Sequence, residues 1–297
     1  MEKKRFAVIV NPVAGGGRTA RLFPRLKEVV ENTNHRFDFY FTEAPYHAAR
    51  ITDKIHREYD AVVAFGGDGT ANEVVNGLAG TTTPFGVIPE GSGNDFARTI
   101  HVSRNIQKAV DLLVKYDYRL MDLGTIDDRV FLNGVGIGFD GFVNYRSKNV
   151  KFLKGSLSYL YAVFSSLAVW KSIPVQIEID GKNIGRSLIY LLAIGNGWSV
   201  GGGLKLTPNA SIHDSLFDIC HVRDIPVWKV MLNFAKLKSG TLEQIREVTI
   251  TRGSKIRVNS EISLPIHFDG EVYPPNTREV NITIVPQSAF VIGNWQA

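Results

Sequence analysis

The first 120 residues show two alternating patterns of apolar positions. Short continuous apolar runs are separated by longer stretches in which apolar residues recur every three or four positions. The short runs predict strands at residues 6–10, 37–42, 61–65 and 85–88, and the longer stretches predict helices at 20–32, 48–58, 70–78 and 106–115. Strands that alternate with helices in this way are typical of a parallel sheet covered on both faces.

The pattern changes after residue 122. Apolar runs now follow one another, with turn signals such as Asp180-Gly181 between them. Strands are expected at residues 130–133, 175–179, 187–194, 217–222, 247–251, 255–259, 264–268 and 279–285, and helices at 155–170 and 227–239. This half is predicted to be a mostly antiparallel β-sandwich or barrel. We therefore expect an α/β domain over residues 1–124 and a β-sandwich domain over residues 125–297, with a ligand site between them.

Composition narrows the class of protein. The formal net charge is +5, and the single cysteine, Cys220, excludes internal disulfides and multi-cysteine zinc clusters. No apolar run reaches the ~20 residues that span a membrane, and the run after the basic start is too short for a signal peptide. These features favour a cytoplasmic protein. The small positive charge suits an anionic partner, but no basic patch interleaved with aromatic residues indicates nucleic-acid binding.

The strongest candidate for chemistry is the segment Gly66-Gly67-Asp68-Gly69-Thr70-Ala71-Asn72. It directly follows a predicted buried strand and precedes a predicted helix. Glycines allow the backbone to turn tightly beside a ligand, and the amides at a helix N-terminus attract anions. Thr70 and Glu73 also have the spacing of a capping box. The segment therefore predicts a phosphate-binding loop, and the alternative is a tight turn before a capped helix.

Two further glycine-rich loops follow predicted strands of the same sheet. Asn11-Pro12-Val13-Ala14-Gly15-Gly16-Gly17 comes after the first strand and lacks the Gly-Lys-Ser/Thr of a Walker A loop. Glu90-Gly91-Ser92-Gly93-Asn94-Asp95 comes after the strand at 85–88. The carboxyl ends of parallel strands meet at one edge of a sheet, so all three loops are expected there. Together they are a more specific signal than any one of them.

The second half contains weaker candidates. Residues 136–141 fit G-x-G-x-x-G, but no acidic residue stands about 20 positions later, and we interpret these glycines as places of close backbone approach. Asp269 and Glu271 lie near the end of a strand, and by spacing alone they indicate a turn with one solvated acid. No histidine has metal-ligand spacing and no serine lies in a G-x-S-x-G elbow, so a hydrolase triad has no support.

With these motifs in hand, the chain resembles the bacterial lipid kinases that carry a diacylglycerol-kinase-type catalytic domain. This family is related to sphingosine kinases and, more distantly, to NAD kinases. The resemblance spans nearly the whole chain and rests on NPVAGGG (11–17), GGDGTANEVVNGL (66–78), EGSGNDFAR (90–98), NGVGIGFD (133–140), GNGWSVGGG (195–203), PNASIHDSLFD (208–218) and FDGE (268–271). It implies a nucleotide-binding α/β domain and a β-sandwich domain that contributes the catalytic base.

The resemblance also implies roles for individual residues. The nucleotide is expected to be held by Asn11, Pro12, Val13, Ala14, Gly15, Thr42, Gly66, Gly67, Asp68, Gly69, Thr70, Ala71, Asn72 and Ser92. Glu271 is expected to act as the general base, with Asp68 as the competing candidate. Phosphoryl transfer depends mainly on positioning and charge neutralisation, which suits a site of this kind.

Two metal sites follow from the same resemblance. A network of magnesium and water is expected around Asp68, Asp95, Asp122 and Asp269, because magnesium prefers hard oxygen ligands. A structural metal site is matched by Asp214 with the backbone carbonyls of Ser211 and Leu216. One departure occurs there, because the family usually has glycine where this chain has Ser215.

The predicted function is transfer of the γ-phosphate of ATP, with Mg²⁺, to the hydroxyl group of a membrane lipid such as diacylglycerol. Phosphatidylglycerol, a polyprenol and a sphingoid base are other acceptors that the sequence leaves open. Lys148, Lys151 and Lys154, followed by the apolar residues 157–170, either press onto an anionic membrane or form a helix packed on the sandwich. The protein is thus expected in the cytoplasm at the membrane periphery, as a monomer or a homodimer.

Two alternative functions remain open. The first is phosphorylation of a soluble acceptor, as in NAD kinases, although the motifs of the second half follow the lipid-kinase pattern. The second is a regulatory protein that binds a nucleotide without catalysis. All the expected carboxylates are present, which counts against this second alternative.

Overall fold

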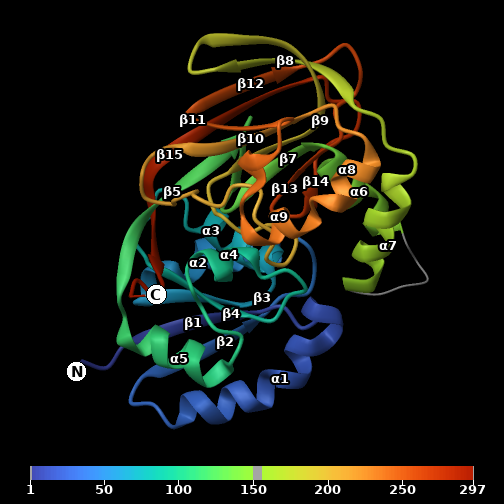
Figure 1. Cartoon of the computed structure of the whole chain (residues 1–297). Helices are drawn as coiled ribbons and strands as arrows, with labels where there is room; N and C mark the ends of the chain where they lie inside the picture. The colour runs from blue at the N-terminus through green and yellow to red at the C-terminus, as the bar shows by residue number, and fades with distance from the viewer. Residues whose placement is uncertain (1, 150–155, 297) are drawn as a thin grey trace. The chain divides into compact units, whose positions relative to one another are not determined.

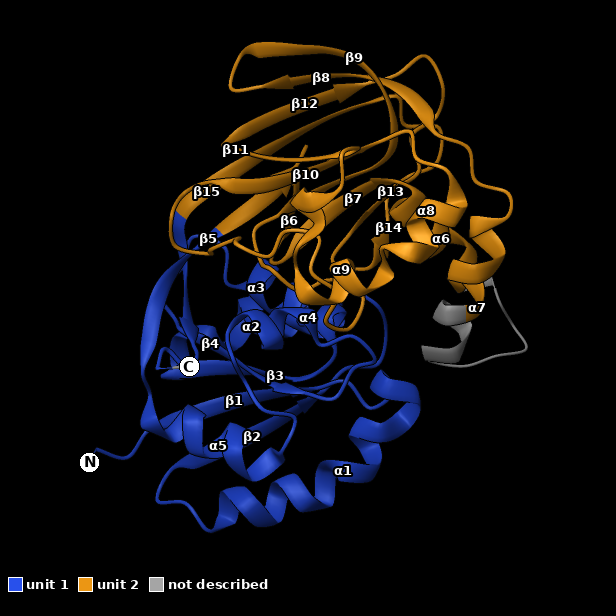
Figure 2. Ribbon diagram, viewed as in Figure 1, with its two compact units in different colours: residues 1–122, 287–297 blue, residues 123–286 orange. Residues whose placement is uncertain are grey.

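The structure, a computed structural model, describes residues 2–149 and 156–296. The chain forms two compact units, residues 1–122 with 287–297 and residues 123–286 (Figure 2). Two strands have residues in both units: β5 (Tyr118–Ile126) leaves the first unit, and β15 (Glu279–Ile292) returns to it.

The first unit is a parallel sheet with helices on both faces. Its strand order is β2-β1-β3-β4, with the strands at β1 (Arg5–Val10), β2 (Arg36–Phe41), β3 (Ala61–Gly66) and β4 (Phe85–Pro89). One face carries α1 (Ala14–Glu31) and α5 (Ile106–Lys115), and the other carries α2 (His47–Ile55), the 3₁₀ turn η1 (His56–Glu58), α3 (Asp68–Gly77) and α4 (Asp95–Thr99) (Figure 1). Every residue of β3 and β4 is buried, which explains why these strands are continuous apolar runs in the sequence.

The C-terminal residues complete this sheet, which the predicted domain boundaries do not include. Val291 of β15 pairs in parallel with Phe85 of β4. The backbone amide of Gln287 donates to the carboxylate of Asp122 at 2.8 Å, and the amide of Asn294 donates to the carbonyl of Ile100 at 3.0 Å. The predicted second domain ends at residue 297, but these contacts place its last residues with the first unit.

One local prediction for this unit is wrong. Thr70 and Glu73 do not form a capping box, because α3 already begins at Asp68. The two carboxylate oxygens of Glu73 instead accept the backbone amides of Tyr46 and Ala48, each at 3.0 Å. Glu73 therefore caps the start of α2 and fastens that helix to α3.

The second unit is an antiparallel β-sandwich. Its strands pair in the order β14-β13-β7-β9-β8-β12-β15-β5-β6, and β9 also pairs with β10, which pairs with β11. The strands not yet given are β6 (Arg129–Phe131), β7 (Gly134–Gly138), β8 (Ile173–Ile179), β9 (Lys182–Gly195), β10 (Phe217–Arg223), β11 (Val248–Gly253), β12 (Lys255–Asn259), β13 (Ile266–Phe268) and β14 (Glu271–Val272). The helices are α6 (Phe139–Asn149), α7 (Ser156–Leu167), α8 (Val227–Leu232), α9 (Phe234–Ser239) and the 3₁₀ turn η2 (Leu242–Gln244).

Alternate residues of the central strand β9 face two apolar clusters. Leu192 and Ile194 belong to the cluster between the strands of the sandwich, whereas Leu191 and Ala193 belong to a second cluster on the other face. Cys220 of β10 is fully buried in the second cluster, where burial raises the pKa of its thiol to about 12. Its thiol is therefore a packing group rather than a nucleophile.

The glycines at 136–141 lie at places of close backbone approach, as interpreted from the sequence. A Cβ on Gly136 would meet the ring of His267 and the carboxylate of Asp140, and a Cβ on Gly141 would meet the carbonyl of Pro265. These glycines allow β7 and α6 to pack tightly against β13.

The segment predicted to touch a membrane falls mostly outside the described residues. Lys151 and Lys154 lie outside them, and so does the side chain of Lys148. In the part of the chain that is described, no helix is both long and apolar enough to cross a membrane.

Candidate active site

The glycine-rich loops after β3 and β4 touch through their backbones. The amide of Glu90 donates to the carbonyl of Gly66 at 2.7 Å. A Cβ on Gly67 would lie 3.0 Å from the Cα of Gly91, and a Cβ on Gly91 would lie 2.5 Å from the Cα of Gly67. Glycine is therefore required at both positions, because neither backbone leaves room for a side chain.

The carboxylate of Asp68 holds the start of α4. Its Oδ2 accepts the amide of Asn94 at 2.7 Å, and its Oδ1 accepts the amide of Phe96 at 3.1 Å. Asn94 is left-handed, with φ +55°, and its side chain closes the turn by accepting the amide of Gly91 at 2.7 Å and donating to the carbonyl of the same residue at 3.0 Å. Asp68 is thus held by backbone groups of the neighbouring loop.

The first glycine-rich loop is tied to the same place. The side-chain amide of Asn11 donates to Oγ1 of Thr70 at 3.1 Å, and its Oδ1 accepts the amide of Val13 at 3.3 Å. Residues 15–17 all have positive φ, between 59° and 83°, which favours glycine. The three loops predicted to share one edge of the sheet are therefore in contact at the carboxyl ends of β1, β3 and β4.

An ion pair between the half-exposed Arg18 and the buried Glu90 joins two of these loops, and the sequence analysis did not single it out. Glu90 is 1% exposed, and its Oε2 lies 2.8 Å from Nε of Arg18, which follows the three glycines. Neither carboxylate oxygen of Glu90 has hydrogen-bond geometry to a partner, so the contact is an ion pair only. Burial raises the pKa of the Glu90 carboxyl, and the smaller attractions of Arg18 and Arg104 oppose that rise.

The carboxylates predicted to form a magnesium network lie in different places. Asp68 and Asp95 both have an Oδ2 beside Gly93, within about 3 Å of where its Cβ would be. Asp122 is fully buried and accepts the amide of Gln287. No group of three His, Cys, Asp or Glu side chains within the described ranges could hold a metal ion, so Asp122 does not join Asp68 and Asp95 there.

The two remaining residues predicted to hold the nucleotide lie at strand ends of the first unit. Thr42 directly follows β2, and its amide donates to the carbonyl of Val10 at 2.9 Å. Ser92 lies between Gly91 and Gly93 and is exposed.

In the second unit, Glu271 begins β14 directly after a tight turn. The preceding Asp269 is left-handed, and its carboxylate accepts three backbone amides, those of Leu132, Asn133 and Gly134, at 2.7 to 3.0 Å. These contacts fasten the turn that precedes Glu271. Glu271 itself is exposed at the start of a strand whose turn is firmly held.

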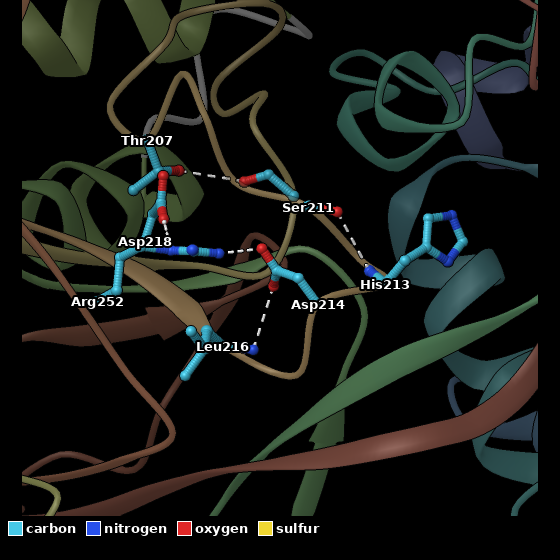
Figure 3. A network of polar contacts seen from close by, with 8 residues as sticks. Thr207, Ser211, His213, Asp214, Leu216, Asp218 and Arg252 are labelled. Carbon is cyan, nitrogen blue, oxygen red and sulfur yellow. Dashed lines mark hydrogen bonds and ion pairs between the residues drawn. The ribbon is translucent and has the colours of Figure 1, made fainter.

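Arg252 pairs with Asp214, the side-chain ligand that the sequence predicts for a structural metal ion. Its guanidinium lies between Asp214 and Asp218 and pairs with both (Figure 3). Asp218 is 3% exposed, and burial raises the pKa of its carboxyl while Arg252 opposes that rise. The side-chain ligand predicted for a metal ion is thus paired with a cation in this structure, and the metal site stays a prediction.

The loop around Asp214 nevertheless keeps a glycine-like conformation. Ser215 has φ +61°, in the left-handed region that glycine adopts without strain. The amide of Leu216 donates to Oδ1 of Asp214 at 3.2 Å and closes the turn. Ser215 therefore adopts a backbone conformation that glycine would adopt without strain.

Arg252→Gln is expected to lower the free energy of unfolding by about 1–3 kcal/mol, because it leaves the buried Asp218 without its cation. Chelation of divalent metals is expected to leave the Tm of the unmodified protein unchanged. Arg257→Gln, which removes an exposed ion pair with Glu279, serves as a control and should cost less than about 1 kcal/mol. A clear fall of the Tm on chelation would restore the metal site and contradict this prediction.

Comparisons with known proteins agree with this architecture. Residues 5–126 match the diacylglycerol kinase catalytic domain, and residues 133–293 match the YegS C-terminal NAD kinase beta sandwich-like domain. A diacylglycerol kinase of Staphylococcus aureus strain MRSA252 is 30% identical over 274 residues, which cover 91% of this chain and 86% of that protein. The chain belongs to the bacterial diacylglycerol-kinase-type family of lipid kinases.

Solved structures share the fold of this lipid kinase. A provisionally assigned diacylglycerol kinase of Bacillus anthracis str. Sterne has a TM-score of 0.79 at 25% identity and covers 99% of each chain. An NAD kinase of Archaeoglobus fulgidus, solved with ATP, has a TM-score of 0.53 at 17% identity over 98% of this chain and 94% of its own. The second likeness concerns the fold alone. The predicted fold, an α/β unit with a parallel sheet followed by an antiparallel β-sandwich, is confirmed.

Proposed function

We propose that this lipid kinase transfers the γ-phosphate of ATP, with Mg²⁺, to the hydroxyl group of diacylglycerol or a closely related membrane lipid. The observation that carries the proposal is the contact of three glycine-rich loops around Asp68, at the carboxyl ends of β1, β3 and β4. Backbone amides and the helix N-termini at this edge suit the phosphate groups of a nucleotide. The relatives named diacylglycerol kinases match across both units.

Asp68 and Asp95 are the residues proposed to hold magnesium. Their carboxylates lie beside the same glycine and offer the hard oxygen ligands that this ion prefers, so the residues fit the ion. When bound, magnesium supplies charge neutralisation for the phosphates. The amides of Asn94 and Phe96 orient Asp68, so that its carboxylate is fixed before any nucleotide arrives.

Glu271 is proposed as the general base. As the lipid oxygen bonds to the γ-phosphorus, the hydroxyl proton moves to the Glu271 carboxylate, and the bond to the departing ADP breaks. Asp68 is less suited to this step, because both of its oxygens already accept backbone amides. Glu271 follows a turn that Asp269 fastens through three hydrogen bonds, which gives the base a rigid support.

The proposal is tested by transfer of labelled γ-phosphate from ATP to lipids in mixed micelles with magnesium. Diacylglycerol, phosphatidylglycerol, a polyprenol and a sphingoid base are supplied separately, and the products are separated by chromatography. A labelled product from diacylglycerol is the expected result. Label in a soluble dinucleotide, with none in any lipid, would overturn the proposal in favour of an NAD-kinase-like activity.

Glu90→Gln is expected to raise the KM for ATP by about tenfold while leaving kcat nearly unchanged, because Arg18 loses the charge that holds it beside the glycine-rich loop. The matched control is Glu28→Gln, which removes the partner of Arg25 on the same helix at an exposed site. Steady-state kinetics at varied ATP concentration distinguish the two variants. An unchanged KM for ATP in Glu90→Gln would show that the charge of Glu90 is not needed to hold Arg18 beside the glycine-rich loop.

The stability of Glu90→Gln relative to the parent protein should depend on pH. The pKa of Glu90 is raised in the folded state, so the folded protein binds this proton more tightly than the unfolded chain does. Ionised Glu90 therefore lowers stability above its folded-state pKa, and this penalty shrinks as the pH falls below that pKa and is gone below the pKa of the unfolded chain. Thermal unfolding should show the variant at least as stable as the parent at neutral pH, with the difference shrinking in acid.

A further inference from the structure

Two short helices of the second unit carry an apolar surface that no part of the described chain covers. Neither α8 nor α9 has a buried residue. Trp228 is 64% exposed and Leu232 is 74% exposed, and Met231 and Phe234 are about half exposed. These four residues are called the α8–α9 patch. The predicted single helix over 227–239 breaks at Asn233, so the two helices lie one after the other on this unit (Figure 1).

The patch is held in place from beneath. Val230 of α8 and Leu237 of α9 pack against the second apolar cluster of the sandwich. The carbonyl of Leu237 accepts the amide of Lys205 at 3.0 Å, and the side chain of Asn233 donates to the carbonyl of Lys229 at 2.8 Å. The helices are therefore fastened by one face, and the apolar side chains on the other face remain exposed.

Lysines lie on the same two helices as the patch. Residues 226–240 contain three lysines and no acidic residue. Lys229 pairs with Glu247 at 2.7 Å, whereas Nζ of Lys238 lies 5.6 Å from the ring centre of Phe234. Lys236 belongs to the same short helix as Lys238. The surface thus combines exposed tryptophan, leucine, methionine and phenylalanine side chains with a net positive border.

We propose that the α8–α9 patch inserts into the headgroup region of a bilayer that contains anionic phospholipid. Apolar and aromatic side chains bordered by lysines suit this interface, where the lysines meet lipid phosphates and the apolar groups reach the upper acyl chains. A second copy of the same patch is disfavoured, because its lysines would face those of the first. The inference rests on the proposed function only in linking the patch to a lipid substrate. Vesicle binding tests the patch without any measurement of turnover.

The first test compares Leu232→Glu with the unmodified protein in sedimentation with vesicles. Vesicles of phosphatidylglycerol with phosphatidylcholine are compared with vesicles of phosphatidylcholine alone. We expect the unmodified protein to prefer the anionic vesicles and Leu232→Glu to bind them at least about tenfold more weakly. The control is Ile184→Glu, since Ile184 on β9 is also half exposed and lies outside the patch. Equal binding by Leu232→Glu and the unmodified protein would overturn the proposal.

A second test addresses the charges. Lys236→Glu with Lys238→Glu is compared with Lys108→Glu and Lys115→Glu, which change the net charge equally on the exposed side of α5. Only the first pair is expected to lower binding to anionic vesicles. An equal loss in both pairs would mean that overall charge, and not the patch, sets the binding.

Activity separates this inference from the proposed function. With long-chain diacylglycerol in anionic vesicles, Leu232→Glu should lose turnover, while activity on a soluble short-chain diacylglycerol should stay unchanged. If no lipid is phosphorylated but Leu232→Glu still loses vesicle binding, the kinase proposal fails and the membrane surface stands. Equal turnover by both proteins on vesicles would overturn the membrane surface and leave the kinase proposal intact.

Discussion

Replacing Glu271 by glutamine is expected to lower kcat by about 10²–10⁴-fold, the usual contribution of a general base. Glutamine keeps the size of the side chain but cannot take the proton of the acceptor hydroxyl. The Kd for ATP should remain within about twofold of the parent value, because the glycine-rich loops proposed to bind ATP lie in the first unit and Glu271 lies in the second. Single-turnover phosphate transfer and direct nucleotide binding separate the two effects.

The control for this experiment is Glu243→Gln. Glu243 is an exposed glutamate on η2 of the same unit, and its replacement makes the same change in charge. Activity of the control should match that of the parent. A Glu271→Gln variant that retains most of its turnover would assign the proton to another group and remove Glu271 from the mechanism.

Asp68→Asn is expected to have the second largest effect, on both stability and activity. Asparagine offers one acceptor oxygen, so one of the amides of Asn94 and Phe96 faces an NH₂ group and loses its hydrogen bond. The free energy of unfolding should fall by about 1.5–3 kcal/mol, the value of a hydrogen bond to a charged group. Turnover should fall by about 100-fold, because the carboxylate proposed to hold magnesium loses its charge and its orientation.

Asp53→Asn provides the matched comparison, because Asp53 is exposed on α2 and outside the loops. Its stability and turnover should be those of the parent. Denaturant unfolding and magnesium titration of the activity are the two measurements. Full stability of Asp68→Asn would mean that the start of α4 does not depend on this carboxylate, contrary to the structure.

The sequence predicts the loops of the first unit well because their position follows from strand order alone. Gly66, Gly67 and Asp68 follow a buried apolar run, and a parallel sheet brings such loops to one edge. Glycine is also required locally, since the backbones of Gly67 and Gly91 approach too closely for a side chain. The order of the strands and the need for glycine therefore both indicate the same loops.

Contacts between side chains distant in the sequence could not be predicted in this way. Arg18 directly follows the first glycine-rich loop, and Glu90 begins the loop after β4. Their opposite charges at one edge of the sheet were the only indication in the sequence that they could pair. Arg252 reaches Asp214 and Asp218 only because β11 pairs with β10, with Arg252 opposite Asp218. That register is a property of the folded sheet, and the sequence pattern alone indicates only two strands.

The helices α8 and α9 show a further limit. Periodicity over 227–239 predicts one amphipathic helix, but it does not tell which apolar residues face the protein. Val230 and Leu237 pack inward, whereas Trp228 and Leu232 remain exposed. The direction of each side chain depends on the break at Asn233.

The return of the C-terminus to the first unit sets an order of events on the ribosome. β4 lacks its neighbouring strand β15 until Val291 has been synthesised, although the other four strands of that sheet, β1 to β4, are made early. At about 5–20 residues per second, the intervening chain takes on the order of ten to forty seconds to emerge. During this interval the nascent first unit has an open strand edge, a site where chaperones or neighbouring chains can pair. Pairing of β15 with β4 closes that edge, so the first unit is completed only after the second unit has been synthesised.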